Sequence, residues 1–103
     1  MKFISTPNKV WENEDVEFFV HCADDGSVWF HHNLKKKLTK DVALSVLISL
    51  KDFFTQVKSV FMVDKIYSWC PDKKVEKWAI WCGCLPSGTI DVDGVTYNIV
   101  EYH

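Results

Sequence analysis

The chain has 103 residues, of which 48% are hydrophobic and 15% aromatic, and its formal net charge is −2. This length predicts a single domain over residues 1–103, and the apolar content excludes an intrinsically disordered chain. All 12 basic residues are lysine. Because arginine is the residue best suited to forked contacts with phosphate, we expect no nucleic-acid partner.

No apolar run is long enough for a signal peptide or for the roughly 20 residues of a membrane span. We therefore expect an intracellular, cytoplasmic protein without a membrane partner, whose cysteines are reduced thiols. Cys22, Cys70, Cys82 and Cys84 form no Cys-x-x-Cys pair, so we expect no metal. The favoured interpretation is buried hydrophobic cysteines with one exposed thiol, since a metal or redox role would need further ligands from the histidines of residues 21–32.

The first half of the chain predicts a β-hairpin after an irregular start. Residues 3–5 form either an edge strand or a loop, and the acidic residues 11–15 form a turn. Residues 16–22 are rich in β-branched and aromatic side chains, and residues 28–34 supply the partner strand. The Asp-Gly signal within residues 24–27 predicts the tight turn between them.

A long helix and a further strand follow the hairpin. The lysines of residues 35–37 lie in the connection, and Thr39 can cap a helix whose first turn holds Asp41, which suits the helix dipole. Apolar residues cover a wide arc of this helix up to about Val57, as expected of a helix packed on a sheet. Residues 59–67 predict a buried strand.

The stretch Asp72–Cys84 predicts a short amphipathic helix with a defined start and stop. Asp72 can cap its first turn, or Pro71 can occupy the first helical position. Gly83 ends the helix, because glycine adopts the left-handed conformation without a steric penalty. One face of the helix is apolar and consists of Val75, Trp78, Ala79 and Cys82.

Strands 89–92 and 95–102, joined by Asp93-Gly94, predict a second hairpin. The order is therefore strand, strand, helix, strand, helix, strand, strand. A helix that crosses between two strands usually makes them parallel, whereas the hairpins are antiparallel. The sequence predicts an α/β fold with one mixed sheet.

This order, together with the 72–84 stretch, resembles the GNAT superfamily of acyl-CoA-dependent N-acetyltransferases over residues 16–102. The short helix of that family carries Asn, two residues, Ala, two residues, Phe-Tyr, three residues, Gly-Phe. The corresponding residues here are Asp72, Val75, Trp78-Ala79 and Gly83-Cys84. The chain is most similar to small, divergent GNAT-like proteins of bacteriophages, some of which are head-assembly or internal virion components.

The resemblance implies an acetyl-CoA site, yet this chain departs from the family pattern at that site. The glycine-containing phosphate loop is replaced by a stretch without glycine, whose candidate cofactor-binding residues are Lys35, Lys36, Lys37, Thr39 and Lys40. These lysines could neutralise phosphate as point charges, and a solvated loop is the favoured alternative. Ala79 occupies the position at which the family has the tyrosine that acts as general acid. Spacing does not single out Tyr67 or Cys70 as a substitute. The N-terminal part also lacks room for the two helices that build the acceptor side of the family.

A general base would have to come from the first hairpin. The candidates are Glu17 and His21 on one strand and His31 on the next, and such a His pair could also bind metal. The favoured interpretation is that these residues have no catalytic role and lie on the solvent-facing side of strands whose positions alternate between solvent and core. Trp11, Trp69 and Trp81 are candidates for an interface with a protein partner or a second copy, because a domain of this size is not expected to bury all its tryptophans.

Two functional hypotheses follow. The first is a catalytically impaired GNAT-like domain without a cofactor that binds a protein, plausibly a phage virion component or a factor that acts on a host protein. The second is a minimal acetyltransferase that binds acetyl-CoA through residues 35–40 and modifies a protein partner. The departures at the phosphate loop and at Ala79 favour the first hypothesis.

Overall fold

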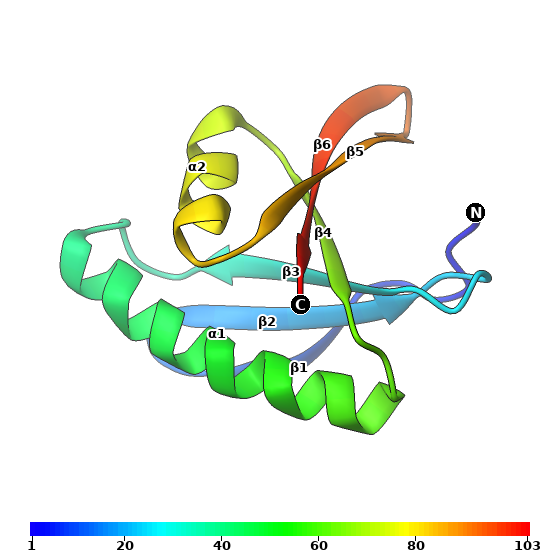
Figure 1. The fold of residues 1–103 in the computed structure, drawn as a ribbon. Coiled ribbons are helices and arrows are strands. Elements are labelled where there is room, and N and C mark those ends of the chain that lie inside the picture. Colours follow the sequence, from blue (N-terminus) through cyan, green and yellow to red (C-terminus); the bar gives the residue numbers. More distant parts are fainter.

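The computed structural model describes residues 1–103 and contains one six-stranded sheet with two helices (Figure 1). The elements are β1 (Asn8–Glu12), β2 (Val16–Cys22), β3 (Val28–Leu34), α1 (Lys40–Phe61), β4 (Ile66–Cys70), α2 (Lys73–Trp81), β5 (Leu85–Val92) and β6 (Val95–Tyr102). The strand order is β1-β2-β3-β4-β6-β5, and only β3 and β4 are parallel. The predicted mixed α/β fold is confirmed. No helix is long and apolar enough to cross a membrane.

Both helices pack on the same face of the sheet. α1 buries one stripe, which consists of Val46, Leu50, Phe54 and Val57. This stripe meets alternate residues of β2 and β3, which are Val16, Phe18, Val20, Val28 and Phe30. α2 packs beside it, because Trp78 and Cys82 line the same cavity as Leu50 and Phe54. The wide apolar arc of α1 therefore exceeds the stripe that the sheet covers.

The opposite face of the sheet carries aromatic side chains and no helix. Phe3 of the N-terminal segment stacks on His21, with 4.4 Å between ring centroids, and meets Trp29 edge-on at 5.4 Å. Trp69 and Tyr67 lie next to Trp29 on the same face. A short segment with one aromatic anchor thus partly covers this face.

The start of the chain differs from the prediction. Residues 3–5 form the loop, which was one of the two predicted alternatives, and Phe3 makes an isolated bridge to Ala23. The first strand is β1, and its last two residues fall in the predicted acidic turn. The register shifts between Lys9 and Trp11, so a bulge interrupts the alternation that marks a strand in sequence.

The boundary between α1 and β4 was also predicted wrongly. Residues 59–61 continue α1, and the helix ends at Met62, whose left-handed backbone has a φ of 56°. β4 begins at Ile66 and extends to Cys70, so Trp69 lies inside this strand, beyond the predicted end at residue 67. A continuous apolar run fits the end of a helix and a buried strand equally well, so periodicity does not place this boundary.

The short helix and the last turn agree with the prediction. Asp72 is the N-cap of α2, and its carboxylate accepts a hydrogen bond from the backbone N–H of Val75 at 2.9 Å. Gly83 has a φ of 101°, as expected of a residue that ends a helix. Asp93 and Gly94 both have a positive φ, as a two-residue hairpin turn requires. β5 is longer than predicted, because it starts at Leu85 and accommodates Pro86 through a bulge at the sheet edge.

Candidate functional site

The two parallel strands diverge and leave an open groove between them. The ladder of β3 and β4 contains one pair, Trp29 with Tyr67, after which β4 rises away from β3 towards α2 (Figure 1). Towards the carboxyl ends of these strands, the facing backbone groups no longer pair with each other. The groove has a volume of about 350 Å³ and is lined by His31, His32, Asn33, Leu34, Ser68, Trp69, Pro71 and Val75. Free backbone groups on two strands suit an extended ligand that carries amides.

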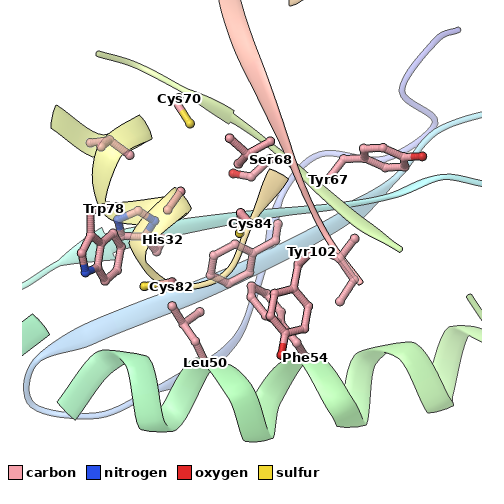
Figure 2. Close-up of a pocket in the computed structure, with 15 residues that line it drawn as sticks. His32, Leu50, Phe54, Tyr67, Ser68, Cys70, Trp78, Cys82, Cys84 and Tyr102 are labelled. Atoms are coloured by element: carbon pink, nitrogen blue, oxygen red, sulfur yellow. The ribbon is translucent and has the colours of Figure 1, made fainter. Parts of the chain in front are cut away.

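An apolar cavity lies behind the groove, between the sheet and the two helices (Figure 2). Its volume is about 40 Å³, so it holds little more than water-sized groups. His32 lines both the groove and the cavity, and its ring lies 5.0 Å from that of Trp78. Burial lowers the pKa of His32 to about 4, so the ring is neutral at neutral pH. The indole Nε1 of Trp78 is buried without a hydrogen-bond partner and remains a free donor beside this cavity.

The structure brings together the two predicted histidines of the first hairpin. His21 and His31 are diagonal neighbours on β2 and β3, and their Nε2 atoms are 2.8 Å apart. His21 Nδ1 lies 3.4 Å from the carbonyl oxygen of Ser5, which can only accept a hydrogen bond. We therefore assign the proton of His21 to Nδ1, so that its Nε2 accepts the Nε2–H of His31.

Burial makes this histidine pair a poor base. His21 is 3% exposed, and burial lowers its pKa, although the hydrogen bond with Ser5 acts in the other direction. Burial, with smaller effects from the neighbouring histidines, lowers the pKa of His31 to about 4. A base with so low a pKa has little tendency to remove a proton from an ammonium group near neutral pH.

Glu17 points to the same face as the pair but has other partners. Its carboxylate accepts a hydrogen bond from the Asn33 amide at 2.9 Å and forms an ion pair with Lys9 at 3.3 Å. These contacts, led by the hydrogen bond from Asn33, lower the pKa of Glu17. Glu17 is thus held as a carboxylate in a structural pair.

The structure supplies no proton donor at Ala79. Tyr67 lies near the start of β4, and its hydroxyl points away from the other labelled side chains of the cavity (Figure 2). Cys70 is buried with Cys84 and Val100, and burial raises the pKa of its thiol to about 11. This thiol lines the inner cavity and not the groove.

Of the four cysteines, Cys70, Cys82 and Cys84 are buried and Cys22 is half-buried. Burial raises the pKa of Cys82 and of Cys84 to about 11 as well. No group of three or more His, Cys, Asp or Glu side chains has the arrangement of a metal site. The buried thiols therefore pack as small apolar groups.

The lysines before α1 are largely committed to ion pairs. Lys35 Nζ contacts the carboxylate of Glu12 at 2.5 Å, and Lys36 Nζ contacts that of Asp15 at 2.9 Å. The backbone N–H of Lys35 also donates to the carbonyl oxygen of Asp15. The hydrogen bond from the paired lysine is the main cause that lowers the pKa of Glu12 and of Asp15. Lys37 is exposed without an ion pair.

The amino end of α1 is capped by the chain itself. Thr39 Oγ1 accepts a hydrogen bond from the backbone N–H of Val42 at 3.3 Å. Asp41 adds a negative charge to the first turn. Lys40 is exposed without an ion pair, so of the predicted cofactor-binding residues only Lys37 and Lys40 offer unpaired charge.

The three candidate interface tryptophans differ in exposure. Trp81 is 54% exposed on α2, and Trp11 is 37% exposed while its ring stacks on Phe18. Trp69 is half-buried, 4.2 Å from the ring of His31, and lines the groove. Trp11 and Trp81 are thus available on the surface, whereas Trp69 belongs to the groove.

Sequence reasoning did not identify the groove itself. His32 and Trp78 were not singled out as site residues, because their proximity depends on the divergence of β3 from β4. The only signal in the sequence was the helix between two strands, which predicts a parallel pair but not where its ladder ends.

The fold of this chain is similar to the folds of solved acetyltransferase structures. No protein-family model and no curated protein matches the chain. Among solved structures, the crystal structure of a probable acetyltransferase matches with a TM-score of 0.58 and 13% identity, over 85% of this chain and 52% of that one. The structure of AAC(6')-Ib in complex with Parmomycin and AcetylCoA matches with a TM-score of 0.52 and 14% identity, over 85% of this chain and 64% of that one.

These similarities show that the chain has the fold of the GNAT acetyltransferases. The chain spans between about half and just under two thirds of the length of these acetyltransferases. Identities of 13% and 14% make this a statement about the fold.

Proposed function

We propose that this GNAT-fold domain does not transfer acetyl groups by the usual route and acts by binding another protein. The observation that carries the proposal is the state of the loop before α1, where carboxylates hold Lys35 and Lys36. A pyrophosphate would have to compete with Glu12 and Asp15 for these charges. It would meet no glycine backbone that could approach it closely.

The chemistry of the groove supports the same proposal. The family's acid position is Ala79, and the histidine of the pair that lines the groove has a pKa of about 4. Glu17 is a carboxylate held by Lys9 and Asn33. Neither general acid nor general base is therefore poised for transfer to an amine near neutral pH.

Exposed apolar residues support a protein-binding role. Besides Trp11 and Trp81, Ile48 is 72% exposed and Val60 is 76% exposed, both on α1. Large exposed apolar side chains in contiguous patches are typical of interaction surfaces. The phage source, and with it a role in the virion or on a host protein, rests on the resemblance of this small, divergent chain to phage-encoded GNAT-like proteins.

Isothermal titration with acetyl-CoA tests the proposal. We expect no binding heat even at millimolar ligand, and no acetyl transfer to amine acceptors. The contrary result would be micromolar binding that is lost when Lys35, Lys36 and Lys37 are all replaced by Ala. A matched control replaces the three lysines of α2, Lys73, Lys74 and Lys77, because it removes the same charge from another surface.

A minimal acetyltransferase is the second candidate, and two observations favour it. The groove between β3 and β4 is open to an extended ligand, and Trp78, whose buried Nε1 donor has no partner, lines the inner cavity behind it. In this case the titration would show binding, and the Trp78→Phe variant, which keeps an aromatic ring but removes the N–H, would weaken it. Absence of binding by the wild-type chain would rule this candidate out.

A further inference from the structure

The bulge in β1 gives this edge strand two unlike faces. Trp11 stacks on the core residue Phe18, with 4.8 Å between ring centroids. Val10 lines a hollow beside α1, so both apolar residues point to the helix side. Lys9 and Glu12 form an ion pair with each other at 3.0 Å, and Lys9 reaches Glu17 on the open face. Of the four residues Lys9 to Glu12, the two central apolar residues thus point to the helix side and the two outer charged residues to the open face.

Two hollows join β1 to the exposed flank of α1. Trp11 shares one hollow with Ile48 and Phe53, and Val10 shares the other with Val60 and Phe61. The exposed fractions are 53% for Val10, 37% for Trp11, 72% for Ile48, 76% for Val60 and 43% for Phe61. We call these five residues, with the half-buried Phe53 between them, the β1–α1 surface. Such a contiguous apolar surface at a sheet edge is typical of an interface.

β1 is the last strand on its side of the sheet and runs along α1 (Figure 1). Its outer backbone groups have no strand to pair with, which makes it a template for another strand. The opposite edge, β5, is less suited to pairing, because Pro86 lacks an N–H and a bulge follows it. A partner strand is therefore expected at β1.

We propose that the β1–α1 surface binds a second copy of this chain, with the two β1 strands antiparallel about a two-fold axis between Val10 and Trp11. In this register Val10 lies opposite Trp11 of the second copy, on the helix side. Lys9 lies opposite Glu12 of the second copy, on the open side. Residues directly opposite in an antiparallel pair point to the same face, so apolar meets apolar and each charge meets its opposite.

The position of α1 in each copy is compatible with the same two-fold axis. The hollow of Trp11 is lined by α1 residues between Ile48 and Gln56, and that of Val10 by α1 residues between Phe53 and Phe61, so the two hollows share Phe53 and Gln56. The axis therefore passes near Phe53 and Gln56, in the carboxy-terminal half of α1, and brings Ile48 towards Val60 of the second copy. Self-complementarity in both strand and helix is what an isologous interface requires, whereas an unrelated partner would have to match the pattern by chance.

This inference rests on the proposed function, protein binding, and identifies the bound protein as a second copy of this chain. The two fail separately. A monomeric chain that ignores acetyl-CoA would overturn the dimer alone, and a dimer that binds acetyl-CoA would overturn the non-catalytic proposal alone.

The first test is the mass of the whole chain in solution, measured by light scattering over a wide concentration range. We expect the mass to approach twice the 12.0 kDa of one chain as concentration rises. Ile48→Lys should shift the chain to monomer, whereas Ile80→Lys should not, because Ile80 is an exposed apolar residue on α2, outside the β1–α1 surface. A wild-type chain that stays monomeric overturns the proposal, as does a dimer that survives Ile48→Lys.

The second test exchanges charges. Lys9→Glu alone places two glutamates opposite each other across the axis, and Glu12→Lys alone places two lysines there. Each variant should dimerise more weakly, on the order of tenfold. An equimolar mixture of the two should recover dimers that contain one chain of each kind, seen by native mass spectrometry. In such a dimer each of the two cross-axis pairs between positions 9 and 12 joins a glutamate to a lysine, so no like charges face each other. Failure of the mixture to recover would overturn the register, since lost contacts within each chain are unchanged by mixing.

Discussion

The histidines of β3 show how burial decides the chemistry of single residues. His31 and His32 are adjacent in sequence, so they point to opposite faces of the strand, and both are half-buried. His31 lies between His21 and Trp69, whereas His32 lies against Phe30 and Trp78. Neither environment supplies a carboxylate that would stabilise the charged ring.

This enclosure predicts a loss of stability in mild acid. In the unfolded chain both histidines bind protons below a pKa of 6.5, but in the folded chain only below about 4. The unfolded state therefore binds more protons between these values, and stability falls as the pH drops from about 6.5 to 4. At pH 5 the loss is up to about 2 kcal/mol for each histidine. Urea unfolding at pH 7 and at pH 5 measures the difference.

The test variant is His32→Gln. Replacing His32 should reduce the loss between pH 7 and pH 5. Equal unfolding free energies at the two pH values in the wild-type chain would contradict the burial of these rings.

At the scale of elements, α2 is the segment whose ends are most clearly encoded. It has nine residues, too few for a stable isolated helix, so it depends on its cap and on the packing of one face. Asp72 supplies the cap, and Gly83 provides the left-handed stop. Both signals are local and can be read from the sequence.

Removing the cap should therefore cost stability. We expect Asp72→Ala to lower the free energy of unfolding by about 1 kcal/mol, because the backbone N–H of Val75 loses its acceptor. Asp72→Asn keeps an acceptor oxygen and should cost much less. Urea unfolding curves of the three chains decide the matter, and an alanine variant as stable as the wild type would mean that the cap contributes nothing.

The end of α1 illustrates the opposite situation. Residues 59–61 are Ser-Val-Phe, which fits a strand by composition, yet the structure continues the helix through them. Val60 and Phe61 are then exposed at the β1–α1 surface instead of buried in the sheet. The position of the helix end depends on where β4 must begin to pair with β6, which is not a local property.

At the scale of the whole molecule, the proposed dimer links stability to concentration. Anything that binds only the folded chain stabilises it by mass action, and here the ligand is a second copy. The thermal midpoint of the wild-type chain should therefore rise with protein concentration. The midpoint of Ile48→Lys should not, and differential scanning fluorimetry over a dilution series compares them. A wild-type midpoint that is independent of concentration would contradict self-association.

The sequence by itself determined the features that arise from neighbouring residues. These are the order of strands and helices from β2 onwards, the two Asp-Gly hairpins and the capped helix α2, because turns, caps and periodicity act over a few residues. Only the tertiary structure decided the divergence of β3 from β4, the contact of His21 with His31, and the capture of Lys35 and Lys36 by carboxylates. Each of these joins residues that are ten or more positions apart, and strand register, which no local signal fixes, sets the distance between them. The fold was therefore predictable in outline, while the character of its site was not.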